Sequence, residues 1–566
     1  MVYALSGLVF LMYIISFYPV LDMNGDNASY LLRAKSLLAG KGFRDLYLIN
    51  EPLVTHLRGF SFSLMYVPLL YLFHYNFILL KLFPFICTFL LFFFIYHFYR
   101  KKMELFRVFI LVVFVALNSQ IVHFSSLIMT ENVFLAFLVL FFILLEKQTR
   151  LEFNGKSILY SILLVFFSFI CYMIREAGIA ILVIGPLYML ITKKIKFLLV
   201  MLFVLLLIFG GYLKYSGHLR NLNMTAQQQS ETSVTADAES SKEPKTFSER
   251  SWIQIYPPMI IEMALSLTKP EQIKKAFTVM AQKFVGDPDE NIFELNWLKI
   301  LAVLVLLSGI YFKIRSKGGF NYYDLFGIFT FLFLTSSAGD PVVLSRYFII
   351  LIPLFYVYFF QGLSGITSFL PQLVRNTVLL SVCGLMLASL LTINCKRVYQ
   401  ARNPYPPVLQ FYIQSAEWVK KNVPSGALVS SRKSSLYYIW SDHKCIHYFD
   451  DLKYSRDDRW SRQFEADTLK YYQKNRIRYV VWDSFSSDAV DKILPIIQNH
   501  PDLFEVMYSP AQFNIPENYI KDLNTQFNVI NLYYQRARQV YVPTVVLKIK
   551  QEFLDKAVRS GPIQKQ

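Results

Sequence analysis

Long apolar stretches recur along most of the chain, and this pattern constrains the fold more than any other feature. The first runs from Val2 to Leu21. Hydrophobic residues make up 55% of the 566 residues, charged residues only 17%, and the mean hydropathy is +0.38. An ordinary soluble globule does not have this composition. The sequence therefore predicts an α-helical polytopic membrane protein.

About eleven transmembrane helices are expected in total. The apolar stretch from Gly59 to Phe73 is too short to cross about 30 Å of hydrocarbon as a helix, so we interpret it as a surface or re-entrant helix. After Val2 to Leu21, the predicted spans are residues 77–99, 105–118, 132–145, 157–174, 177–192, 195–213, 297–312, 324–338, 346–363 and 375–393.

The connecting loops predict the orientation. If the amino terminus is cytoplasmic, every short basic loop falls on the cytoplasmic side, as the positive-inside rule requires. We therefore expect a multi-pass protein of the plasma (inner) membrane whose carboxyl-terminal region faces outward. The formal net charge of +18 fits basic residues that face anionic membrane lipids, and no nucleic-acid partner is expected. The basic residues of the short cytoplasmic loops are Arg100, Lys101, Lys102, Arg107, Lys147, Arg150, Lys156, Lys193, Lys194, Lys196, Lys313, Arg315, Lys317 and Arg375.

Two domains are predicted: a transmembrane domain over residues 1–395 and a small external α/β domain over residues 396–566. The transmembrane domain has a first external loop with surface helices at 22–76 and a second external loop at 214–296. A disordered insert is expected at about 223–250, which is rich in Gln, Ser, Thr and Glu. In the external domain we expect a helix from Ser415 to Asn422 and strands from Ala427 to Ser431, Tyr479 to Trp482 and Tyr541 to Ile549.

The five cysteines are scattered and have no paired metal-ligand spacing, so neither a disulfide framework nor a cysteine metal site is expected. They are Cys87, Cys171, Cys383, Cys395 and Cys445.

Charged residues gather at the predicted outer ends of the spans, although charge is costly there and often marks a functional site. Asp26 can cap a helix that Gly40 ends, and this could be its only role. The other charges could be interfacial anchors. Their convergence on one side favours a pocket for an anionic lipid head group and a nucleophile. The set is Asp22, Asp26, Arg58, Glu131, Arg175, Glu176, Lys214, Asp340 and Arg346.

Several short motifs are spread from the first external loop to the external domain. They are Gly25-Asp26-Asn27-Ala28-Ser29-Tyr30, Ala34-Lys35-Ser36-Leu37-Leu38-Ala39-Gly40-Lys41-Gly42-Phe43, His56-Leu57-Arg58-Gly59-Phe60-Ser61-Phe62-Ser63-Leu64, Met129-Thr130-Glu131-Asn132, Ser345-Arg346-Tyr347 with Pro353, Glu417-Trp418-Val419-Lys420-Lys421-Asn422-Val423-Pro424 and Tyr479-Val480-Val481-Trp482-Asp483. These motifs resemble the GT-C membrane glycosyltransferases, in particular the branch that holds protein O-mannosyltransferases and aminoarabinose transferases. Many members have a second acid where this chain has Asn27, and a Pro-Pro pair where it has Arg58-Gly59.

The resemblance implies that a sugar passes from a polyprenyl-phosphate donor to an extracytoplasmic glycan, lipid or protein. Arginines would bind the lipid phosphate, because planar guanidinium groups match phosphate oxygens. Asp26 is the candidate general base and Glu131 a positioning acid. No cofactor is expected, and the missing second acid gives no support for a divalent metal. Asp22, Arg58, Arg175, Arg346 and Tyr347 are the candidate substrate-binding residues.

Two alternatives stay open. A transporter or flippase of lipid-linked saccharides would place ionisable groups near the bilayer midplane and show matched halves. A polymerase or ligase of lipid-linked oligosaccharide would share the enzyme class and differ in the acceptor. The sequence names neither the sugar nor the acceptor.

Overall fold

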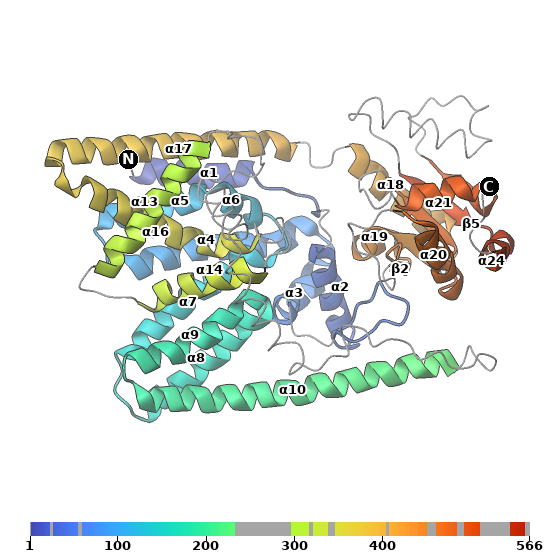
Figure 1. The fold of residues 1–566 in the computed structure, drawn as a ribbon, viewed down its shortest axis with the longest axis horizontal. Helices are drawn as coiled ribbons and strands as arrows, with labels where there is room; N and C mark the ends of the chain where they lie inside the picture. The colour runs from blue at the N-terminus through green and yellow to red at the C-terminus, as the bar shows by residue number, and fades with distance from the viewer. Residues whose placement is uncertain are drawn as a thin grey trace. The chain divides into compact units, whose positions relative to one another are not determined.

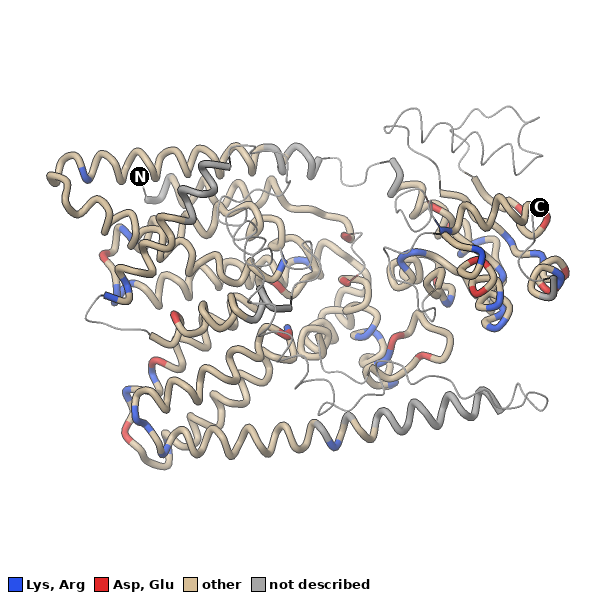
Figure 2. The backbone as a smooth tube through the Cα atoms, in the orientation of Figure 1, with Lys and Arg blue, Asp and Glu red and all other residues tan. Residues whose placement is uncertain are grey.

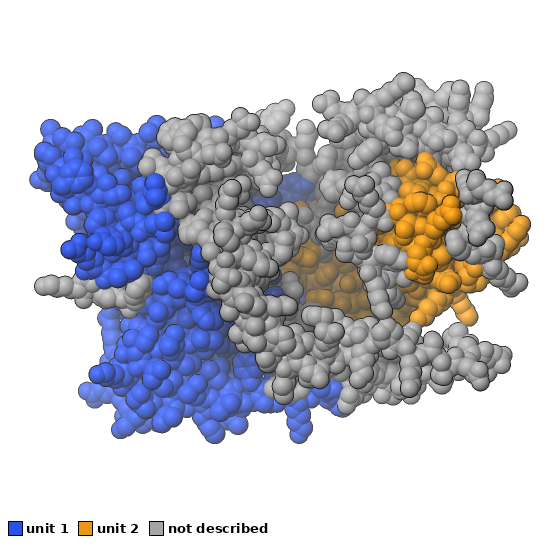
Figure 3. Space-filling view, in the orientation of Figure 1, with its two compact units in different colours: residues 1–20, 55–402 blue, residues 21–54, 403–566 orange. Residues whose placement is uncertain are grey.

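The computed structural model describes ten segments of the chain, and all structural statements below concern these residues. They form two compact units, which Figure 3 colours blue and orange. The first unit holds residues 1–20 and 55–402, and the second holds residues 21–54 and 403–566. The described residues are 2–22, 26–54, 59–232, 296–315, 321–337, 346–402, 407–449, 460–483, 492–509 and 544–560.

The first unit is helical, and each predicted span corresponds to a helix or a helix pair (Figure 1). Its core is formed by apolar side chains of most of these helices. The helices are α1 (Val2–Ile15), α3 (Phe60–Phe73), α4 (Phe77–Tyr99), α5 (Leu105–Leu117), α6 (Ser119–Ser125), α7 (Thr130–Thr149), α8 (Gly155–Ile174), η1 (Glu176–Gly178), α9 (Ile179–Ile191), α10 (Ile195–Thr232), α13 (Asn296–Arg315), α14 (Tyr322–Ser337), η3 (Phe348–Leu351), α16 (Ile352–Ile366), η4 (Thr367–Phe369) and α17 (Gln372–Arg402).

Length and composition identify fewer spans than the eleven expected. Five stretches of the described residues are long and apolar enough to cross a membrane, or six if α5 and α6, which meet at 62°, form one broken span. The short helix expected after Gly59 is present as α3, with 14 residues. The chain is therefore a multi-pass membrane protein, and the count of eleven stays a prediction. The five stretches are Phe77–Tyr99, Gly155–Ile174, Ile195–Tyr212, Phe348–Phe369 and Gln372–Cys395.

One helix extends further than predicted. Residues 223–232, expected to begin the disordered insert, are the last ten residues of α10. This part contains Met224, Ala226 and a run of glutamines, and it has neither proline nor glycine to stop a helix that has already begun. The rest of the predicted insert, residues 233–250, lies outside the described residues.

Close backbone contact joins α13 to α16. A Cβ atom built on Gly309 would lie 1.8 Å from the carbonyl oxygen of Tyr358, and one on Gly362 would lie 2.0 Å from that of Val305. Only glycine permits such an approach, as in the small-residue interfaces of membrane helices. These contacts fix the position of α16, which follows the segment that carries Arg346.

The second unit contains a five-stranded mixed sheet with strand order β2-β1-β3-β5-β4. Strand β1 runs parallel to β2 and β3, whereas β5 runs antiparallel to β3 and β4. This confirms a small sheet, and two strands were missed: β2 has only two residues, and β4 lies at an edge. The strands are β1 (Val429–Ser431), β2 (Cys445–Ile446), β3 (Tyr479–Trp482), β4 (Phe504–Tyr508) and β5 (Val545–Ile549).

The helices of this unit include one from the segment predicted to be the first external loop. Helix α2 contacts α19, and Leu48 packs against the core around the sheet. The part of the first loop between residues 21 and 54 therefore groups with the carboxyl-terminal residues. The helices are α2 (Asp26–Leu38), α18 (Pro407–Asn422), α19 (Ser434–Ser441), α20 (Arg462–Lys474), α21 (Leu494–Asn499), η6 (Pro501–Leu503) and α24 (Gln551–Ser560).

Polar contacts hold the loop to the sheet. Lys444 donates hydrogen bonds to the Glu51 carboxylate at 2.6 Å and to the carbonyl oxygen of Leu46, and the Cys445 amide donates to the carbonyl oxygen of Tyr47 at 2.8 Å. Burial raises the pKa of Glu51, but the ammonium groups of Lys444 and Lys41 outweigh this effect and hold the pKa below its usual range. The ionised Glu51 carboxylate therefore stabilises the packing of the first-loop residues against the sheet.

This ion pair predicts a pH-dependent stability difference. A carboxyl group whose pKa is depressed by folding contributes stability above its unfolded pKa of about 4.3 and loses it as pH falls through the folded value. We expect Glu51→Gln to lower the Tm at pH 7 and the deficit to shrink below about pH 4. Tryptophan fluorescence can follow the transition because Trp482 is buried in this unit.

Glu505→Gln is the control for that comparison. The side chains of Glu505 and its partner Lys548 are both nearly half exposed, and their charges are 3.7 Å apart, so their ion pair should contribute little. A Glu51→Gln deficit that is equal at pH 3.5 and pH 7 would show that the charge is irrelevant to docking.

Candidate functional site

Three chain segments of the first unit bring charged side chains together. Glu131 lies in the first turn of α7, and Arg175 caps the carboxyl end of α8 with extended backbone. Arg346 directly precedes Tyr347, the N-cap residue of η3. Each residue stands at the end of an apolar helix, where the backbone can turn its side chain toward the others. The sequence separates Glu131 from Arg346 by 215 positions.

Both arginines bind the same carboxylate oxygen. Arg175 Nη1 lies 2.9 Å from Glu131 Oε1, while Arg346 Nη2 and Nε lie 3.0 Å and 3.2 Å from it. Arg175 also donates to Thr130 Oγ1 at 3.0 Å, and its guanidinium lies 4.5 Å from the centre of the Tyr347 ring. Four sequence-predicted residues, Glu131, Arg175, Arg346 and Tyr347, therefore form one cluster.

Burying charged groups costs free energy, so a buried charged cluster often marks a functional site. The Glu131 side chain is fully buried and that of Arg175 is 7% exposed, whereas that of Arg346 is 33% exposed. Among the described residues, Glu131 Oε2 and Arg175 Nε have no hydrogen-bond partner. Buried polar atoms in native proteins nearly always have partners, so two orphaned atoms beside two arginines mark this cluster as a candidate ligand site.

The charge balance indicates the sign of that group. Two guanidinium groups against one carboxylate leave one positive charge, and the partly exposed Arg346 opens the cluster on one side. Guanidinium groups bind phosphate and carboxylate oxygens with two parallel hydrogen bonds. Glu131 accepts from both arginines, so it is suited to orienting them rather than to receiving a proton. The cluster can bind an anion.

The predicted acids of the first loop belong to the second unit. Asp26 is the first residue of α2 and is exposed, and Asp22 is half-buried. The buried Asn27 donates from Nδ2 to the carbonyl oxygen of Asp22 at 2.6 Å, which holds the chain at the start of the helix. The helix ends near Gly40, whose φ of 70° suits glycine. Arg58 and Asp340, which also belong to the predicted set, lie outside the described residues.

Lys81 is a polar residue of the first unit that the sequence analysis did not select. It lies within the apolar helix α4, is fully buried, and donates hydrogen bonds to the carbonyl oxygens of Tyr18, at 2.7 Å, and Val20. A lone lysine inside an apolar span was the available signal. Its ammonium group fixes the main chain that follows α1, which leads into the first loop.

The described residues contain no group of three or more His, Cys, Asp or Glu side chains placed to hold a metal ion. The five cysteines are free thiols in the structure, and Cys87, Cys171 and Cys445 are buried.

Comparison with known proteins finds matches to solved structures and none by sequence. No protein-family model matches the chain, and no curated protein matches it in sequence. The oligosaccharyltransferase from Archaeoglobus fulgidus in complex with Zn and sulfate aligns with a TM-score of 0.58 and 11% identity, over 96% of this chain and 88% of that one. Oligosaccharyltransferase AglB from the same organism, in complex with an inhibitory peptide and a dolichol-phosphate, gives a TM-score of 0.55 and 11% identity, over 97% and 88% of the two chains.

ArnT from Cupriavidus metallidurans bound to undecaprenyl phosphate aligns over 97% of both chains with 10% identity, but its TM-score of 0.47 is too low to support an inference. At such identities the likeness to the archaeal structures shows the fold alone. The chain therefore shares the fold of these oligosaccharyltransferase structures, and the resemblance of its motifs to GT-C membrane glycosyltransferases is confirmed at the level of the fold.

Proposed function

We propose that the chain is an integral membrane glycosyltransferase that moves a sugar or oligosaccharide from a polyprenyl-phosphate-linked donor to an extracytoplasmic acceptor. The observation that carries the proposal is the pair of arginines on Glu131, because a buried cluster with excess positive charge suits a lipid phosphate. The archaeal AglB structure with the same fold contains a dolichol-phosphate, which is a phosphate of this class.

In this proposal the arginines act on the leaving group. The acceptor hydroxyl attacks the anomeric carbon, the bond from that carbon to the phosphate oxygen breaks, and negative charge grows on the phosphate. Arg346, the more exposed arginine, contacts the phosphate, and Arg175 adds positive charge from behind. Glu131 keeps both guanidinium planes in place. Tyr347 stacks on Arg175 and limits its motion.

Asp26 is the proposed base that takes the proton of the acceptor hydroxyl. Its exposed position at the start of α2 leaves the carboxylate accessible to a substrate, and the Asn27 contact to Asp22 fixes the backbone before it. Asp22 and Arg58 stay proposed substrate-binding residues. The resemblance in the first loop supports these roles.

The proposal is tested with purified protein and a panel of polyprenyl-phosphate sugars. Consumption of one donor in the presence of cell-envelope acceptor material, with release of polyprenyl phosphate, would support transfer. Movement of intact donor across a vesicle membrane without cleavage would instead support the flippase alternative. If no donor is cleaved or moved, the chain is not an enzyme of this class.

We also propose that the acceptor site and the second unit lie outside the cytoplasm. In protein with Cys395 replaced by serine, we expect Lys41→Cys and Glu505→Cys to label from outside intact cells and Glu104→Cys to remain unlabelled until the cells are opened. The native side chains at these positions are 52%, 47% and 74% exposed, so access to the reagent depends on the membrane side. Labelling of Glu104→Cys and Glu505→Cys from the same side would contradict this orientation.

A further inference from the structure

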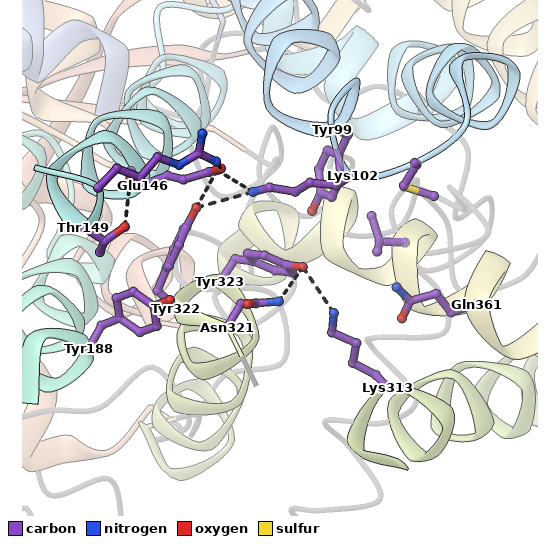
Figure 4. Close-up of a pocket in the computed structure, with 13 residues that line it drawn as sticks. Tyr99, Lys102, Glu146, Thr149, Tyr188, Lys313, Asn321, Tyr322, Tyr323 and Gln361 are labelled. Carbon is purple, nitrogen blue, oxygen red and sulfur yellow. Dashed lines mark hydrogen bonds and ion pairs between the residues drawn. The ribbon is translucent and has the colours of Figure 1, made fainter. Parts of the chain in front are cut away.

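A second polar site lies at the other end of α7 from Glu131. A cavity of about 360 Å³ is lined there by Lys102, Glu146, Arg150 and Lys313, together with tyrosine side chains (Figure 4). Glu146 lies 15 residues after Glu131 in the same helix, which corresponds to about 22 Å along its axis. The cavity is thus separate from the arginine pair. Its size is within the range of small-molecule sites.

The cavity lining carries excess positive charge. Of the described side chains that line it, Glu146 alone is acidic, against Lys102, Arg150 and Lys313. Glu146 Oε2 lies 2.7 Å from Lys102 Nζ and accepts from the Tyr322 hydroxyl at 3.0 Å, and Glu146 Oε1 pairs with Arg150. The carboxylate is therefore fully engaged, which leaves the lining with a net charge of two positive units.

A neighbouring acid reduces this excess without removing it. Asp324 does not line the cavity; it accepts from the Tyr358 hydroxyl at 2.7 Å and from the Asn321 amide at 2.8 Å. With Asp324 included, one positive charge remains. In the helical unit, Figure 2 shows Lys and Arg gathered toward the ends of helices, with few charges between the ends.

Further polar groups of the lining suit a ligand with several acceptor oxygens. Lys313 Nζ and Asn321 Nδ2 both donate to the Tyr323 hydroxyl, at 3.4 Å and 2.9 Å. Burial lowers the pKa of Lys102, an effect that Glu146 opposes, so a second anion near this ammonium group would be stabilised.

We propose that this cavity binds a phosphate group, separately from any donor phosphate at the arginine pair. A phosphate presents several oxygens to donors from different directions, which matches cationic groups at the carboxyl end of α7, on α13 and on the loop after α4. A bound cation is disfavoured by the net positive charge. The phosphate could come from a lipid head group of the adjacent leaflet or from solution, and either source would tie together these three segments.

Thermal unfolding of the full-length protein distinguishes the two sources. In one arm, the Tm is measured in nanodiscs of phosphatidylcholine with and without phosphatidylglycerol. In the other arm, detergent-purified protein is titrated with inorganic phosphate at constant ionic strength. We expect a Tm increase of several degrees in at least one arm. A rise with phosphatidylglycerol alone identifies a lipid source, and a rise with inorganic phosphate identifies a soluble one.

Single substitutions test whether the Tm increase arises from binding in this cavity. Lys313→Gln should lose most of the increase, whereas Lys147→Gln, which removes a positive charge from the last turn of α7 outside the cavity lining, should keep it. If Lys313→Gln does not fold, Lys102→Gln replaces it with the same expectation. A wild-type protein that shows no increase in either arm, or cavity variants that keep the full increase, would overturn the proposal. Donor cleavage is not part of this readout, so failure of the proposed transfer reaction would leave the result interpretable.

Discussion

Asp26→Asn is expected to reduce sugar transfer by about 10²- to 10⁴-fold, which is the usual contribution of a general base. The change keeps the size of the side chain and the first turn of α2, and Asp26 is exposed, so folding should be preserved. Donor binding should also persist, because the proposed phosphate contacts come from other residues. The measurement is the initial rate of transfer at saturating donor, together with the Tm.

Asp442→Asn is the matched control for this substitution. Asp442 is also an exposed aspartate of the second unit, and its φ of 57° is a conformation that asparagine adopts readily. We expect its rate to equal that of the wild type. Transfer by Asp26→Asn within about tenfold of the wild type would show that Asp26 serves only the helix start, because a general base contributes more than this.

The helices, and the side of the membrane domain on which the charged residues lie together, could be predicted from sequence. Apolar runs of helical length marked the helices of the first unit. The basic loops indicated which helix ends lie on the same side of the membrane. This assignment placed Glu131, Arg175 and Arg346 on one side, and the structure brings these three residues together. The pairing itself could not be predicted, because sequence does not show which ends of separate helices pack together.

Other features depend on packing that the local sequence does not reveal. Strand β2 has two residues and carries too little pattern to be recognised. The association of residues 21–54 with the sheet depends on contacts between residues far apart in the sequence, such as Lys444 with Glu51. Lys81 stands out in the sequence as a lone lysine in an apolar span, but its main-chain carbonyl partners could not be predicted.

Arg346→Lys is expected to lower kcat/KM for the donor by about 10- to 100-fold, although the charge is kept. Arg346 uses two nitrogens, Nη2 and Nε, on Glu131 Oε1 and has a partly exposed guanidinium for a ligand. A single ammonium group cannot hold Glu131 and a phosphate in the same plane. The loss corresponds to about one hydrogen bond to a charged group, or roughly 1.5–3 kcal/mol.

Arg375→Lys is the control for Arg346→Lys. Arg375 lies in the same unit and donates to Ser364 Oγ at 3.0 Å, and it does not belong to the Glu131 cluster. We expect its donor kinetics to match those of the wild type. Equal losses in both variants would indicate a general effect of replacing arginine in this unit rather than a phosphate site.

The central claim is that the arginine pair on Glu131 binds the phosphate of the lipid donor. The most direct measurement is the Kd of polyprenyl phosphate without sugar for the wild type, Arg346→Lys and Arg375→Lys, by equilibrium binding in detergent. We predict a Kd at least about tenfold weaker for Arg346→Lys alone, as expected for loss of one charge-assisted hydrogen bond. An Arg346→Lys protein that binds polyprenyl phosphate as tightly as the wild type would contradict the account.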